Sequence, residues 1–232
     1  MPVEIGRIEA LFRYPVKSMR GESLDSVELG WHGFEADRRL GFRRLDERGG
    51  FPWLTAGKLP GLVRYSPTAS GHVRTPAGEE LPVFSDALAA EVGRSFGAPV
   101  QMMELRHGIF DDAAISVIAS DTVREICEDA GVPADVRRFR PNILVRLALP
   151  EAFQEDGWVG SVLRFGDERE GPAVSVTMRD LRCGMVNLDP ENAVAAPEVL
   201  KAVVRRNQTN AGVYATVIRT GRLVVGQGIY VG

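Results

Sequence analysis

The chain has 232 residues, of which 44% are hydrophobic and 25% charged, so its composition is that of a globular protein and excludes a disordered or fibrous one. With a formal net charge of −3, no general attraction to nucleic acid or to anionic membranes is expected. No run approaches the ~20 apolar residues of a membrane span, and the start lacks a secretory signal, so we expect a cytoplasmic protein.

Short apolar or alternating runs, separated by turns rich in Gly, Pro and Asp, predict a β-rich chain. The expected strands span residues 5–13, 23–28, 40–46, 61–66, 100–104, 115–118, 143–145, 162–165, 173–178, 213–218 and 223–231. Strands therefore outnumber helices in both halves, without the regular strand–helix alternation of a doubly wound sheet.

Three segments follow the helical spacing of apolar residues instead. Residues 85–96 have Ser85 as the expected N-cap. Residues 120–130 have Ser120 as the expected N-cap, and their apolar face turns Cys127 inward. Residues 197–205 begin at a proline and end at basic residues, which suits both ends of a helix.

The common catalytic and metal-binding motifs do not occur in this sequence. Its two cysteines and three histidines are too scattered for a structural zinc site, and it has no phosphate-binding glycine loop or serine elbow. Chemistry is best sought at Cys183, which follows an apolar strand near Arg179 and Arg182, because cations favour the reactive thiolate. A buried core cysteine is the alternative there, and it is the expected state of Cys127.

Two cationic clusters could hold an anion. In the loop 14–21, Lys17 and Ser18 could grip a phosphate, although solvated surface charge is the alternative. In 137–142, arginines and Asn142 precede an apolar strand, which suits either capture of a phosphate or carboxylate or a structural salt-bridge corner.

Together the clusters resemble the MOSC-domain family, which includes the C-terminal part of molybdenum-cofactor sulfurase and the mitochondrial amidoxime-reducing component. The motifs that carry the resemblance are Tyr14-Pro15-Val16-Lys17-Ser18, Gly33-Phe34-Glu35-Ala36-Asp37-Arg38, Leu54-Thr55-Ala56, Arg138-Phe139-Arg140-Pro141-Asn142 and Arg182-Cys183 followed by Asp189-Pro190. The resemblance covers nearly the whole chain. It implies a β-rich α+β fold, with an N-terminal β-barrel-like module over residues 1–105 and a MOSC β-barrel with peripheral helices over residues 106–232.

The resemblance also implies a molybdenum–molybdopterin cofactor whose metal is ligated by Cys183, in a cleft between the two parts. By position, the residues that would hold the cofactor are Lys17, Ser18, Arg38, Asp112, Arg140, Asn142 and Arg182. The implied activity is that of an oxidoreductase for N-oxygenated or related small molecules. Since no four-cysteine iron–sulfur domain follows, its electrons would come from a separate flavin, haem or ferredoxin partner.

Two positions depart from the reductase-type pattern. Leu181 stands where such relatives commonly place a serine, and Val186-Asn187 replaces paired threonines. These departures favour a second hypothesis, a cofactor carrier or sulfur-transfer module that uses a Cys183 persulfide. A pyridoxal-phosphate role ranks third, because it needs a Schiff-base lysine and Lys17 is expected to bind an anion.

Overall fold

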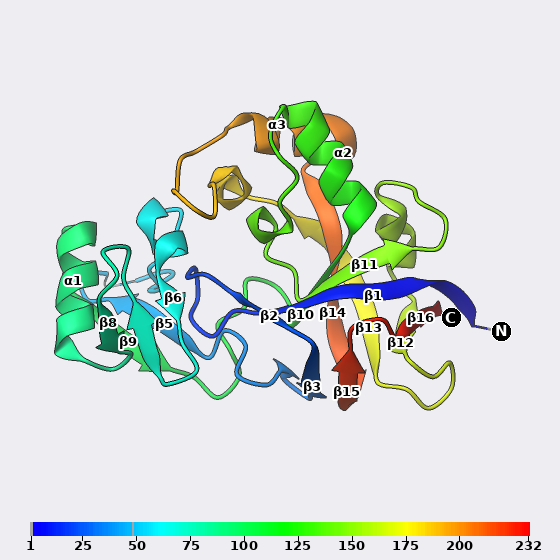
Figure 1. The fold of residues 1–232 in the computed structure, drawn as a ribbon, viewed down its shortest axis with the longest axis horizontal. Coiled ribbons are helices and arrows are strands. Elements are labelled where there is room, and N and C mark those ends of the chain that lie inside the picture. The colour runs from blue at the N-terminus through cyan, green and yellow to red at the C-terminus, as the bar shows by residue number, and fades with distance from the viewer. Residues whose placement is uncertain (1, 48) are drawn as a thin grey trace.

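The computed structural model describes residues 2–47 and 49–232 as a strand-rich protein with three α-helices, so the predicted β-rich α+β fold is confirmed. Figure 1 shows the barrel strands around β1 on one side and α1 with β5, β8 and β9 on the other. No helix in the described ranges is long and apolar enough to cross a membrane.

Seven strands close a barrel in the order β1-β11-β10-β14-β13-β12-β16, because β11 also pairs with β1. Their bounds are β1 (Val3–Arg13), β10 (Ile115–Ala119), β11 (Ile143–Leu147), β12 (Val162–Phe165), β13 (Ala173–Leu181), β14 (Asn210–Arg219) and β16 (Gly228–Val231). Only the β10–β11 pair is parallel among these seven pairings. Alternating apolar residues such as Val117, Val145 and Phe165 fill the core.

The other strands form the edge of this barrel and three small sheets. They are β2 (Glu22–Leu24) beside β1, the sheet of β15 (Gly221–Val224), β3 (Ser26–Gly30) and β4 (Gly33–Phe34), the pair β5 (Leu40–Arg44) and β9 (Val100–Glu104), and the sheet of β6 (Ser66–Pro67), β7 (His72–Arg74) and β8 (Glu80–Pro82). A second core lies under the last two sheets, where Phe42, Leu62 and Leu88 are buried together.

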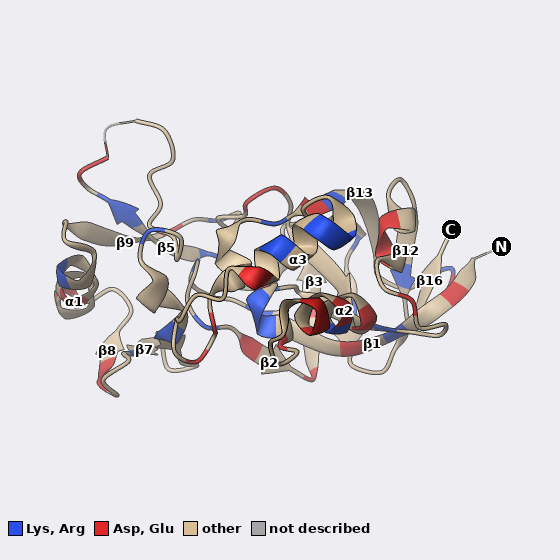
Figure 2. Ribbon diagram, turned by 90° about the horizontal axis from the view of Figure 1, so that it is seen from above, with Lys and Arg blue, Asp and Glu red and all other residues tan. Residues whose placement is uncertain are grey.

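The helices cover the sheets through their apolar faces. Their bounds are α1 (Asp86–Phe96), α2 (Ser120–Ala130) and α3 (Glu198–Asn207), with short 3₁₀ helices η1 (Pro60–Arg64), η2 (Val136–Arg138), η3 (Gln154–Trp158) and η4 (Gly184–Asn187). In α2 and α3, Ile126 and Val203 join a third core. Acidic residues of α2 lie near basic residues of α3 in Figure 2, and the Arg205–Asp129 ion pair at 2.8 Å links the two helices.

Three predicted strands are wrong or split. Residues 61–66 contain a 3₁₀ helix, because Pro60 fixes its first turn and the adjacent Leu62 and Val63 are both buried rather than alternating. The run 23–28 divides at Asp25 into β2 and β3, which pair with different strands. The run 223–231 divides at Gly226.

The predicted caps of two helices have different outcomes. The Ser85 side chain accepts a hydrogen bond from the Leu88 N–H, which confirms it as the N-cap of α1. Ser120 is not the N-cap of α2, because it is already helical and its hydroxyl donates to the Val145 carbonyl at 3.3 Å, while Ala119 occupies the cap position.

The proposed division at residue 105 falls in the connection between β9 and β10 and stays a prediction. Packing crosses it, because β1 closes the C-terminal barrel and Leu29 of β3 shares the barrel core. The consequence is that the loop after β1, which carries Lys17, leaves directly from a barrel strand.

Candidate functional site

The two cysteines are both free thiols in contrasting environments. Cys127 is fully buried on α2, as predicted. Cys183 is exposed between the end of β13 and η4, so the core alternative does not apply to it. It lines a cleft of about 460 Å³.

Six further predicted residues line this same cleft, from both sides of the molecule. They are Lys17, Ser18, Arg38, Asp112, Arg140 and Arg182. The structure thus brings together positions that are distant in the sequence, since 166 positions separate Lys17 from Cys183. Their role toward a cofactor stays a prediction.

Lys17 is a buried cation whose ammonium is already oriented. It donates to the Ile109 carbonyl at 3.0 Å and to an Asp111 carboxylate oxygen at 2.8 Å. Burial lowers the pKa of Lys17, and the neighbouring Asp111 carboxylate opposes that shift. Asp111 was not predicted from the sequence, although it lies next to the predicted Asp112.

Arg38 is held by a buried polar network behind the cleft. It pairs with Asp37, which is 0% exposed, and donates to the Arg140 carbonyl at 2.9 Å. Asn142 is only 1% exposed and donates to Asp37 at 3.0 Å, so the structure places Asn142 behind the wall rather than in its surface. Asn142 also accepts a hydrogen bond from Arg38 at 3.3 Å, while its predicted contact with the cofactor stays a prediction.

Arg140 is the cation of this wall that most needs an anion. Its guanidinium lies 4.1 Å from the centre of the Tyr14 ring and donates to the Met19 carbonyl at 2.6 Å. Among the described residues no carboxylate forms an ion pair with it, and its Nη2 is buried without a hydrogen-bond partner. Burial lowers the pKa of Arg140 to about 10, while the Tyr14 neighbour opposes the shift.

Three of the cleft residues have left-handed backbone conformations, which are unfavourable for residues other than glycine. Their φ angles are 66° for Ser18, 49° for Arg38 and 52° for Arg140. Such conformations cost free energy and cluster at functional sites. The chain therefore accepts backbone strain at the positions whose side chains line the cleft.

Arg182 anchors the opposite, barrel wall of the cleft. It donates to the Ala211 and Phe139 carbonyls, each at 2.7 Å, and pairs with Asp180 at 2.8 Å. Gly212, at φ 82°, permits this approach, because a Cβ there would lie 2.6 Å from the Val117 carbonyl oxygen and 3.2 Å from Arg182. Arg182 is thus fixed before any ligand binds.

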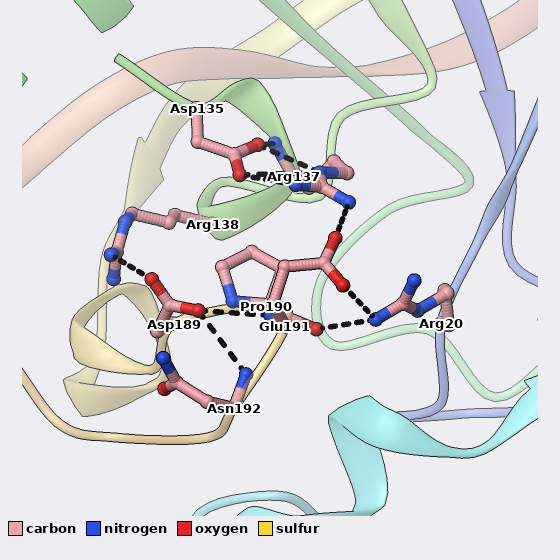
Figure 3. A network of polar contacts seen from close by, with 8 residues as sticks. All are labelled: Arg20, Asp135, Arg137, Arg138, Asp189, Pro190, Glu191 and Asn192. Carbon is pink, nitrogen blue, oxygen red and sulfur yellow. Dashed lines mark hydrogen bonds and ion pairs between the residues drawn. The ribbon is translucent and has the colours of Figure 1, made fainter. Parts of the chain in front are cut away.

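The loop that follows Cys183 is fastened by the network in Figure 3. Arg138 donates to the Asn187 carbonyl at 3.1 Å and to Asp189 at 2.9 Å. Arg20 donates to Glu191 at 2.8 Å, and Arg137 pairs with the same carboxylate. Arg137 and Arg138 of the 137–142 cluster thus form a salt-bridge corner, while anion binding by Arg140 stays a prediction.

The two departures from the reductase-type pattern have different environments. Leu181 is 65% exposed and lines the cleft. Val186 is buried, and the Asn187 side chain accepts a hydrogen bond from the Leu200 N–H at 2.9 Å near the start of α3. Asn187 therefore has a structural role in this chain.

Three polar residues of the barrel wall were not predicted from the sequence, namely Ser116, Asp180 and Tyr214. Asp180 follows an apolar run directly before Leu181, and a charge at the end of such a strand is the signal that could have found it. Ser116 and Tyr214 lie inside predicted strands, where nothing distinguishes them from other polar strand residues. In the described ranges, no group of three or more His, Cys, Asp or Glu side chains could hold a metal ion.

Comparison with known families identifies the fold and its class. The MOSC domain model matches residues 104–230, and the MOSC N-terminal beta barrel domain model matches residues 5–112. The chain therefore belongs to the MOSC-domain family. A search of curated proteins finds no match.

Two solved structures match this chain, and the likeness of the first supports the fold. The YuaD protein from Bacillus subtilis has 16% sequence identity and a TM-score of 0.55, over 100% of this chain and 98% of that chain. YiiM from Geobacillus stearothermophilus has 19% identity and a TM-score of 0.40, over 51% of this chain and 54% of that chain.

Proposed function

We propose that this MOSC protein binds a molybdenum cofactor in the cleft and reduces N-oxygenated or related small molecules. MOSC domains are linked to molybdenum-cofactor binding in general. The observation that carries the proposal is the exposed Cys183 thiol in one cleft with Lys17, Arg140 and Arg182.

The residues present suit such a cofactor. Arg140 offers an anionic group a buried, unpartnered guanidinium N–H, which costs free energy until an acceptor reaches it. Cys183 offers a single soft ligand, and the pterin would supply the other sulfur ligands of the metal. A bound molybdenum cofactor supplies two-electron oxygen exchange with the substrate.

The protein's own residues would then bind and orient. Lys17, Ser18 and Arg38 would hold polar groups of the pterin from one wall, and Arg182 from the other. Asp112, which is exposed at the cleft, would accept from a ring N–H group. Electrons would come from a separate flavin, haem or ferredoxin protein, and a free thiol at Cys183 favours a reducing compartment such as the cytoplasm.

The test is turnover of an N-hydroxylated compound with an artificial reductant, by protein from a cofactor-proficient host. The proposal expects the reduced amine as product with the wild type and none with Cys183→Ala. Equal turnover by both proteins would contradict it.

A sulfur-transfer or carrier function is the second candidate, and the exposed apolar Leu181 beside the exposed Cys183 favours it as a protein-docking feature. It expects cyanide-labile sulfur on Cys183 and no reduction of the N-hydroxylated compound. A pyridoxal-phosphate role stays third, because the Lys17 ammonium is engaged by Asp111.

A further inference from the structure

Asp180 is a buried carboxylate at the cleft that pairs with Arg182 but has no proposed contact with the cofactor itself. It lies three residues before Cys183, is 1% exposed and lines the cleft. Its Oδ2 accepts from the Ser116 hydroxyl at 2.9 Å and pairs with Arg182 at 2.8 Å. Among the described residues, none donates a hydrogen bond to Oδ1. One carboxyl oxygen is therefore held while the other is available.

Three neighbouring strands bring Asp180 together with Ser116 and Tyr214. In the barrel, β14 lies between β10 and β13, with Ser116 opposite Tyr214 and Tyr214 opposite Met178. Asp180 comes two residues after Met178, and all three polar side chains line the cleft. The barrel wall thus presents a row of hydroxyl, phenol and carboxyl groups to whatever occupies the cleft.

The charges around Asp180 set its proton affinity. Burial raises the pKa of Asp180 to about 6, and Asp111 adds to the shift, whereas Arg182, Ser116 and Arg38 oppose it. Burial and the Asp180 charge both raise the pKa of Tyr214, so the phenol stays protonated at neutral pH. A carboxyl group that titrates near neutrality can donate a proton and recover it within a catalytic cycle.

We propose that Asp180 is a catalytic acid, which donates a proton to the oxygen that leaves an N-oxygenated substrate in the cleft. The inference rests on the proposed reductase function. An N-hydroxylated amine takes up two protons and two electrons, the electrons coming from the separate flavin, haem or ferredoxin protein. The N–O bond breaks, an N–H bond forms and the oxygen leaves as water. Asp180 supplies one of the two protons and regains it from solvent through the open cleft, and Ser116 is a positioning residue.

Asp180→Asn is the main test, because the amide oxygen can still accept from the Ser116 hydroxyl and lie beside the Arg182 guanidinium while the acidic proton is lost. With the cofactor-loaded protein we expect unchanged molybdenum content and a fall in turnover of an N-hydroxylated amine of about 100-fold, the low end of general acid catalysis. Wild-type turnover should fall as pH rises above about 6, whereas the variant should lack this dependence. Asp121→Asn is the matched control, since Asp121 is also buried and paired with an arginine but lies on α2.

A second measurement does not depend on turnover. Carboxyl infrared or carbon NMR titration should show a group with a midpoint near 6 in the wild type that is missing from Asp180→Asn. Ser116→Ala should move this midpoint, and the pH dependence of turnover, upward, because it removes a hydrogen bond that favours the charged form.

Several results would overturn the acid assignment. Normal turnover by Asp180→Asn would contradict it, and so would a titration midpoint of Asp180 near the ordinary value of about 4. Loss of molybdenum from Asp180→Asn would show that Asp180 only holds Arg182. A wild type without molybdenum and without turnover would instead refute the proposed function, and with it the catalytic role.

Discussion

The two walls of the cleft hold their polar side chains by different means. On the barrel wall, Ser116 and Asp180 project from β10 and β13, so the strand ladders fix their positions. On the other wall, Lys17 and Arg38 come from loops and are held by carboxylates, Lys17 by the exposed Asp111 and Arg38 by the buried Asp37. A wall built from strands needs few ion pairs, whereas a wall built from loops depends on them.

Asp37→Ala is expected to have the largest effect, because it removes the central acceptor of the loop wall. Asp37 accepts from the Tyr14 N–H at 2.7 Å and from Asn142 at 3.0 Å, and it pairs with Arg38. Breaking a buried pair on one side typically costs about 3–5 kcal/mol. Urea unfolding measures this loss. The control is Glu35→Ala, which removes an exposed carboxylate, and a loss below ~1 kcal/mol for Asp37→Ala would refute the dependence on ion pairs.

The buried Asp180 on the barrel wall makes the free energy of unfolding depend on pH. The folded-state pKa of Asp180 is raised to about 6, so the folded protein binds more protons than the unfolded chain between about pH 4 and pH 6. Stability contributed by this group is therefore lost as pH rises through that range, by up to about 3 kcal/mol. As pH rises through this range, the free energy of unfolding of the wild type should therefore fall relative to that of Asp180→Asn. A constant difference would mean that Asp180 titrates normally.

The two cysteines give a smaller contrast in stability. Cys127→Ala empties part of a buried site and should cost about 1–2 kcal/mol, while leaving molybdenum content unchanged. Cys183→Ala alters an exposed residue and should change stability by no more than ~0.5 kcal/mol. Thermal unfolding of both variants decides this, and a large loss with Cys183→Ala would indicate a structural thiol.

The smallest loss of stability is expected from a substitution in the loop after Cys183. Glu191 is half exposed where it pairs with Arg20 and Arg137, so solvent screens the interaction. Glu191→Gln should therefore cost less than ~1 kcal/mol, and added salt should reduce even that difference. A cost that persists in 1 M salt would show that the loop is held as firmly as the loop wall around Asp37.

Much of the fold follows from local patterns. Ser85 and Gly97 delimit α1 as expected, because capping is decided within one turn. The strand predicted at 61–66 fails, because Pro60 and the adjacent buried Leu62 and Val63 suit a 3₁₀ turn equally well in isolation. Closure of the barrel by β1 and β11 joins residues more than a hundred positions apart, which no local pattern specifies.

The residues of the candidate site also fall into two groups, those that short sequence motifs predict and those that only the folded structure reveals. Lys17, Arg140 and Cys183 are found from residue type and order, since each stands in a short motif. Asp37 and Asp180 acquire their meaning only from burial against partners distant in sequence, such as Asn142 and Ser116. The burial that raises the pKa of Asp180 exists only in the folded chain.

The most direct test of the central claim is the molybdenum content, by elemental mass spectrometry, together with released pterin, by fluorescence. Wild type and Cys183→Ala from a cofactor-proficient host should be compared beside a known molybdoenzyme. We predict near-stoichiometric molybdenum in the wild type and background levels in the variant. Molybdenum retained by Cys183→Ala, or a folded wild type without metal and pterin while the known enzyme is loaded, would contradict the account.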